Sequence, residues 1–245
     1  MNQIIKMDRR LAVLTAALVL SATAASFAET ITFQQGVSPD VSYDMGGTDI
    51  RSNDDPRQKY GGSPNMLVGS FGRNEEIQSE PGFVRGVLEI DLSALKDAAS
   101  GKRLTIDSVS LTLHIASVMG VNAANTIEIG LFSLVEDFDE NFDTGETYVD
   151  HSVGVTELGM VMIDNSNPLV IFDSSSAFIA AVNDALAGSD NTLRLVLRAS
   201  EEQEASEVFR FVRFFSDDAS PENSSQGGGE LNLRPALSID YKLAP

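Results

Sequence analysis

Few side chains in this sequence are suited to catalysis. There is no cysteine and there are only two histidines, His114 and His151, so thiol chemistry is excluded and imidazole chemistry has two candidates. Neither histidine has a second histidine at the spacing of a zinc site. No Gly-x-Ser-x-Gly elbow supports a serine hydrolase. We therefore expect a protein that is not an enzyme, with a sandwich-type polysaccharide lyase or hydrolase left open as a third hypothesis.

Carboxylates are abundant, and their number alone says little. With 36 Asp and Glu residues, some pairs will lie at the separations of about 5 to 10 Å used by glycosidases through chance alone. The densest cluster lies within 136–150, where Asp139, Asn141 and Asp143 alternate like the first ligands of an EF-hand loop. Gly145 comes one residue too late for that loop, and no helix is predicted on either side. The segment is either a calcium site or a solvated acidic loop.

Basic residues are scarce, so their placement is more informative. Arg194 and Arg198 share one face of a predicted strand at 192–199, and Arg213 lies on the next predicted strand, 208–215. If these two strands pair, their guanidinium groups would stand together and could hold carboxylates or sulfates of an acidic polysaccharide. The alternative is that each arginine pairs with a nearby glutamate. The predicted ligand-binding residues are Arg194, Arg198, Arg213, Arg85 and Tyr60.

Tyr60 is included because it lies in a Gly-rich turn, where its ring could stack on a sugar. The chain has no tryptophan and only four tyrosines. This scarcity of aromatic platforms weakens the case for a neutral glycan.

The elements that must position these residues are mostly strands. Apolar and polar residues alternate with a period of two, most clearly from Ser108 to Ile115, and this pattern is typical of half-buried strands. It recurs in segments 84–92, 127–131, 192–199 and 237–241, and the aromatic run 208–215 is a further predicted strand. Short strands between turn-rich segments predict an all-β fold, an antiparallel jelly-roll-type β-sandwich.

One short helix interrupts the strands. Hydroxyl caps at Ser174–Ser176 and a stop at Gly188 bracket an apolar stripe at helical spacing. We expect this stripe to pack against the core rather than to bind a partner.

The N-terminus predicts export. Lys6, Arg9 and Arg10 precede the apolar run 11–20, which small residues follow up to Ala28. This order is typical of a secretory signal peptide at 1–28. Residues 29–245 then form a single β-sandwich domain with a mobile loop at 217–230. The predicted localisation is secreted: extracellular, at the cell surface or periplasmic, with no membrane insertion after cleavage.

The charge balance narrows the partners. Removing residues 1–28 takes three of the 17 basic and one of the 36 acidic residues, which leaves 14 against 35. So acidic a surface repels phosphate backbones, and nucleic acid is not an expected partner. No cofactor is indicated with certainty, and calcium is the one candidate.

Six segments, in order along the chain, resemble parts of DNRLRE-type domains, the group that includes carbohydrate-binding module family 96. They are 43–50, 60–63, 67–69, 85–93, 111–113 and 234–241. Two departures stand out: Phe138-Asp139-Glu140 replaces the family's W-x-E segment, and Glu89 stands where a basic residue is usual. The resemblance implies a β-sandwich of exported proteins that are attached to, or act on, extracellular polysaccharide.

The leading functional hypothesis is therefore a secreted, non-catalytic carbohydrate-binding module that recognises an acidic or matrix polysaccharide. The alternative is a structural protein of an extracellular surface or biofilm, stabilised by calcium. Oligomeric state and the identity of the glycan are not predicted.

Overall fold

The protein is described from a computed structural model, which covers residues 28–36, 45–51, 65–71, 82–134, 154–206, 208–219 and 231–244. Eleven strands lie in these ranges: β1 Ala28–Phe33, β2 Met45–Arg51, β3 Asn65–Phe71, β4 Gly82–Asp91, β5 Arg103–Met119, β6 Ile127–Ser133, β7 Glu157–Ile163, β8 Leu169–Phe172, β9 Thr192–Ala199, β10 Arg210–Phe215 and β11 Ala236–Ala244. The helices are α1 Ser93–Ala98, α3 Ser176–Ala187, α4 Glu201–Glu204 and the 3-10 turn η2 Leu231–Leu233.

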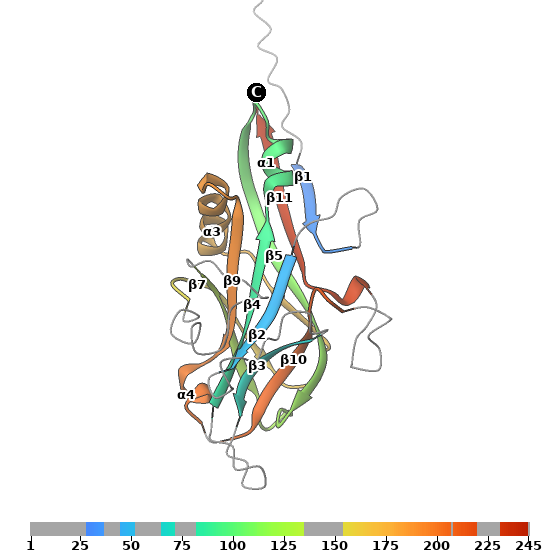
Figure 1. The fold of residues 1–245 in the computed structure, drawn as a ribbon, viewed down its shortest axis with the longest axis vertical. Coiled ribbons are helices and arrows are strands. Elements are labelled where there is room, and N and C mark those ends of the chain that lie inside the picture. Colours follow the sequence, from blue (N-terminus) through green and yellow to red (C-terminus); the bar gives the residue numbers. More distant parts are fainter. Residues whose placement is uncertain are drawn as a thin grey trace, which may run out of the picture.

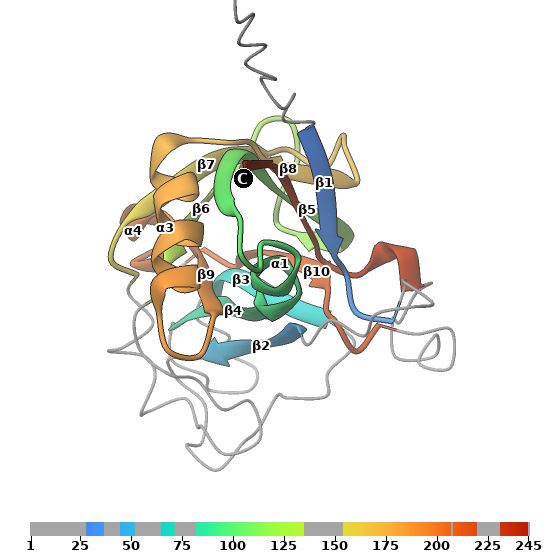
Figure 2. The same cartoon turned by 90° about the horizontal axis from the view of Figure 1, so that it is seen from above.

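Every strand pair is antiparallel. The strands follow the order β1-β11-β5-β10-β3-β4-β9-β6-β7, with β2 also paired to β4 and β8 to β5. The long strand β5 joins the two layers, because its first part pairs with β11 and its last residues pair with β10. The sheet curls around a common interior (Figures 1 and 2). The prediction of an all-β, antiparallel jelly-roll-type sandwich is confirmed.

The interior is built from the predicted alternation. Val109, Leu111 and Leu113 of β5 are completely buried in the main core, as are Leu195 and Leu197 of β9. The opposite face of the sheet is also closed over its centre, since Val87 of β4 and Val196 of β9 are fully buried as well. The backbone at Gly154 packs over Phe132 and Val196, so close that an added Cβ would lie 2.4 Å from the Phe132 Cβ. The alternation of residues in the sequence did not predict that this opposite face of the sheet is also buried.

Helix α3 is the helix predicted from the sequence. The Ser175 side chain accepts a hydrogen bond from the Phe178 amide at 3.0 Å, which caps the N-terminus. The helix ends before Gly188. Phe178 and Val182 are buried in the main core, which confirms the predicted core-packing role of the stripe. Helices α1 and α4 are short and were not predicted.

The predicted signal peptide and the predicted mobile loop lie mostly outside the described residues. Ala28, the last residue of the predicted signal peptide, is the first residue of β1 and lies opposite Lys242 of β11. The predicted mobile loop 217–230 begins with a buried turn, in which the Ala219 carbonyl accepts a hydrogen bond from Arg234 Nε at 2.7 Å. In the part of the chain that the structure describes, no helix is both long enough and apolar enough to cross a membrane.

Candidate functional site

A groove of about 440 Å³ runs between α3 and β9, and we call it the α3–β9 groove. Its walls come from α3, from β9 with the turn before it, and from the end of β6 and residue 156. It is lined by Ser133, Leu134, Thr156, Ala177, Ala180, Ala181, Asp184, Ala185, Gly188, Asp190, Thr192, Leu193 and Arg194. One of the predicted ligand-binding residues, Arg194, therefore belongs to this groove.

The helix wall is open because its side chains are small. Phe178 and Val182 anchor α3 in the core, so the helix cannot move away from the sheet without exposing large apolar surface. The groove side of α3 then presents Ala177, Ala180 and Ala181, which leave the space that larger side chains would fill. The groove is thus held open by a rigid helix and a rigid sheet.

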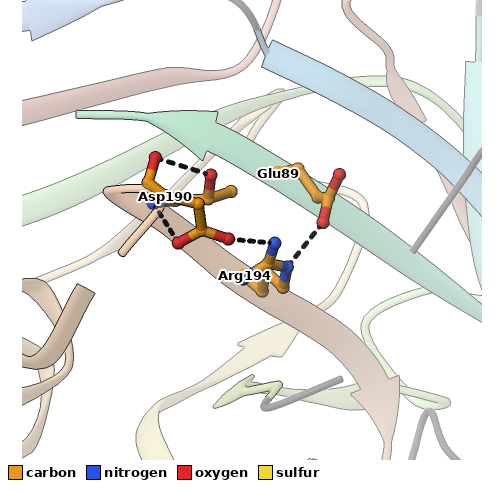
Figure 3. A network of polar contacts seen from close by, with 4 residues as sticks. Glu89, Asp190 and Arg194 are labelled. Carbon is orange, nitrogen blue, oxygen red and sulfur yellow. Dashed lines mark hydrogen bonds and ion pairs between the residues drawn. The ribbon is translucent and has the colours of Figure 1, made fainter. Parts of the chain in front are cut away.

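The strand wall carries an ion network (Figure 3). Arg194 Nε donates to Glu89 Oε1 at 2.7 Å, and Arg194 Nη2 donates to Asp190 Oδ2 at 2.6 Å. Glu89 lies directly opposite Arg194 in the pairing of β4 with β9. The Thr192 amide donates to the other oxygen of Asp190 at 3.2 Å. The Arg194 side chain is 15% exposed and lies at the groove wall.

These contacts keep the groove's charges fixed. The hydrogen bond from Arg194, followed by that from the Thr192 amide, holds the pKa of Asp190 below its ordinary value. Burial acts to lower the pKa of Arg194, but its hydrogen bonds to Asp190 and Glu89 outweigh burial, and the pKa is raised. Both groups are therefore charged at neutral pH.

A second carboxylate faces the network from the helix. Asp184 lines the groove from α3, and among the described residues its side chain has no hydrogen-bond or ion-pair partner. It lies in the last turn of α3, in which there is no basic residue. The groove therefore contains more negative than positive charge.

Arg85 is placed very differently. Its Nε and Nη2 donate to the two carboxylate oxygens of Glu204 in α4 at 2.9 and 2.6 Å, and both side chains are only 7% exposed. The guanidinium also lies 4.2 Å from the centre of the Phe83 ring. Both members of this bidentate pair are thus shielded from solvent, and the pairing of Arg85 with Glu204 was not predicted from the sequence.

Arg198 and Arg213 do not join the groove. Arg198 stacks over Phe132 at 4.3 Å and approaches Glu201 at 4.0 Å. Strand β10, which carries Arg213, pairs with β3 and β5 instead of β9. The predicted arginine cluster required β9 and β10 to pair. Because β3 and β4 lie between them, these two strands do not pair and the cluster does not form. Arg213 is half-buried between Leu67 and Ser117, and its Nε has no hydrogen-bond partner among the described residues.

Several predicted residues lie outside the described ranges, namely Tyr60, His151 and the acidic segment 136–150. Within those ranges, no group of three or more side chains could hold a metal ion. His114 is half-buried on β5, and its Nδ1 has no hydrogen-bond partner among the described atoms.

Sequence reasoning missed the groove residues Asp184 and Asp190. The four-residue separation of Asp190 and Arg194 was a signal for a local ion pair, although here the pair spans a turn and a strand. Asp184 gave no usable signal, because one more acid on a helix of so acidic a chain is unremarkable.

Comparisons with known proteins add little to this geometry. No family model matches the chain, and no curated protein matches it. Among solved structures, the chain is similar to one in a cryo-EM structure of Mud crab tombus-like virus, with 7% sequence identity, a TM-score of 0.30, and coverage of 100% of this chain and 93% of that chain. A TM-score this low carries no argument. The resemblance to DNRLRE-type domains stays a prediction.

Proposed function

We propose that this protein is a secreted, non-catalytic module that binds a matrix polysaccharide in the α3–β9 groove. The observation that carries the proposal is a groove of about 440 Å³ in which hydroxyl, carboxylate and guanidinium groups converge opposite a wall of alanines. Its volume is in the range typical of small-molecule sites. The predicted signal peptide and the resemblance to DNRLRE-type domains support the extracellular setting.

The chemistry of the lining suits a sugar ring. A pyranose has carbon–hydrogen faces that pack on small apolar side chains and hydroxyls that both donate and accept hydrogen bonds. The alanines of α3 offer the first kind of contact, and Thr156, Asp184 and Asp190 offer the second. Because the strand wall is already ordered by the Arg194 network, little conformational entropy is lost when a ligand binds.

The geometry does not favour recognition of an acidic polysaccharide by an arginine cluster. Arg194 holds two carboxylates and Arg85 holds one. An anionic ligand at Arg194 would meet Asp184 and Asp190 in the same groove and be repelled by both. The arginines therefore serve the fold and organise the groove walls.

A non-catalytic role is consistent with the charge states in the groove. A glycosidase acid must keep its proton at neutral pH, which requires a raised pKa. Asp190 does not suit the role of that acid, because its hydrogen bond with Arg194 lowers its pKa.

Affinity electrophoresis on a panel of neutral, amine-bearing, uronate and sulfated polysaccharides tests the proposal. We expect retardation on at least one polymer and its loss in Ala180→Leu, which places a larger side chain in the groove. Ala187→Leu is the matched control, since Ala187 is exposed on the same helix but does not line the groove. No retardation on any polymer, or equal loss in both variants, would contradict the proposal.

A second candidate function is a structural protein that assembles on an extracellular surface. It is favoured by β7, which ends the described sheet and exposes Met160 and Met162 by 44% and 57% beside Ile171 of β8. An edge strand with exposed apolar side chains is a template for pairing with the same strand of a second copy. Light scattering would detect this assembly, and Met162→Lys is expected to abolish it, whereas a monomer at all concentrations would remove this candidate.

A further inference from the structure

We infer that the sugar units bound in the α3–β9 groove carry free primary amines, so that the ligand is a cationic, hexosamine-type glycan. This inference rests on the proposed function and deepens it by naming the ligand class. It depends on the charge balance of the groove, on the unpartnered carboxylate of Asp184 and on the polarity of α3.

The charge balance is negative on both walls. Asp184 and Asp190 line the groove, and Glu89 lies behind the strand wall. Among the described lining residues the positive group is Arg194, which forms ion pairs with Glu89 and Asp190. A ligand ammonium would therefore enter a site with excess negative charge, and a ligand carboxylate would be repelled.

Asp184 is the residue best placed to bind the ammonium. Its side chain has no partner among the described residues, while the other groove carboxylate is already held by Arg194. A carboxylate that accepts a hydrogen bond from an ammonium forms a charge-assisted contact, which is stronger than a contact between neutral groups. Among the described residues, the helix side of the groove thus offers a carboxylate for a cation and has no basic side chain beside it.

The dipole of helix α3 also favours a bound cation. The helix has 12 residues, and its C-terminal end, which carries partial negative charge, lies at Gly188 in the groove lining. A helix of this kind is commonly stabilised by a Lys, Arg or His in its last turn, and α3 has no basic residue there. An ammonium bound near Asp184 would occupy that place.

An ammonium fits the lining better than a metal ion does. Calcium requires six or more oxygen ligands, usually including several carboxylates. No cluster of three or more acidic or histidine side chains suited to a metal occurs in the described ranges. An ammonium has three donors, and Asp184, Thr156 and Asp190 provide acceptors around a space whose alanine wall suits the sugar carbons.

Calorimetry with a short, fully de-N-acetylated oligomer of glucosamine, beside the N-acetylated oligomer and an oligouronate, tests the inference. We expect the amine-bearing oligomer to bind most tightly. Asp184→Asn should weaken it by roughly tenfold or more, the size of a lost charge-assisted hydrogen bond. Asp97→Asn is the matched control, because Asp97 is an exposed aspartate of α1 outside the groove.

The outcomes separate this inference from the proposed function. If only the N-acetylated or uronate oligomer binds, and Ala180→Leu abolishes that binding, the polysaccharide module stands and the amine requirement is overturned. If Asp184→Asn and Asp97→Asn weaken binding equally, attraction between a polycation and an acidic surface explains the result, and the inference is overturned. If none of the oligomers binds, the amine requirement is overturned, and the proposed function is overturned as well only if no polymer of the electrophoresis panel retards the protein.

Discussion

Two arginines on neighbouring strands form ion pairs of opposite character. Arg85 of β4 is enclosed with Glu204 beneath α4, and both side chains are 7% exposed. Arg194 of β9 holds Glu89 and Asp190 at a groove wall, where the Asp190 side chain is 47% exposed. Arg85 therefore stabilises one local arrangement and is closed to ligands, whereas Arg194 orders carboxylates that a ligand can reach.

The difference shows that the surroundings of an arginine decide its role. Both residues appear in the sequence as basic positions on strands in an acidic chain, and each has glutamate partners. A buried charge that loses its partner is strongly destabilising, because the desolvation cost stays uncompensated. A partly exposed charge that loses a partner is solvated by water, and the cost is small.

The largest predicted effect is at the sealed pair. Glu204→Ala removes the carboxylate that accepts two hydrogen bonds from buried Arg85 and should lower the free energy of unfolding by about 3 to 5 kcal/mol. Urea denaturation measures this. The double variant Arg85→Met/Glu204→Met should recover most of the loss, since it removes both charges together. A Glu204→Ala protein as stable as the parent would show that the two sites do not differ.

The next effect concerns the helix wall of the groove. Ser175→Ala removes the cap of α3 and should cost about 1 kcal/mol. The same denaturation series measures it. Ser176→Ala is the matched control, because Ser175 is the residue whose side chain accepts the Phe178 amide hydrogen bond. Equal losses of unfolding free energy in the two variants would show that the Ser175 cap does not stabilise helix α3.

A smaller effect is expected at the open pair. Glu89→Gln keeps the shape of the side chain and removes its charge, and it should cost less than about 1 kcal/mol because the pair is partly solvated. A loss as large as that of Glu204→Ala would erase the contrast between the two arginines. Thermal melts of both variants, at matched ionic strength, give the comparison directly.

The smallest effect is a dependence on pH. Since Arg194 and the Thr192 amide lower the pKa of Asp190 from its ordinary 3.8, the folded state binds this proton less readily than the unfolded state. The resulting stability is present above 3.8 and is lost as the pH falls through the lowered value. Asp190→Asn should therefore flatten the melting temperature against pH in that acid range only. A change confined to neutral pH would contradict this assignment.

The sequence predicted the fold through two periodicities. The alternation at Ser108–Ile115 and the capped stripe of α3 both depend on neighbours close in sequence, and both are present as expected. The arrangement of the arginines could not be predicted in this way. It depends on β3 and β4 lying between β9 and β10. This strand order is set by pairing between residues far apart in the sequence, which local patterns do not encode.

The candidate site was only partly predictable for the same reason. Arg194 was identified from its scarcity, but its partner Glu89 is 105 residues away and is brought opposite it by strand pairing. Glu89 had been noted only as a departure from the basic residue usual in DNRLRE-type domains. In the structure, Glu89 is the ion-pair partner of Arg194.

Two-dimensional amide NMR of the protein, titrated with the de-N-acetylated glucosamine oligomer, tests most directly whether the α3–β9 groove is the ligand site. We expect the largest shift changes at Thr156, Ala180, Asp184 and Thr192, with little change around Arg85 or Arg213. Shift changes centred on Arg213 and β10, with the groove amides unaffected, would contradict this expectation.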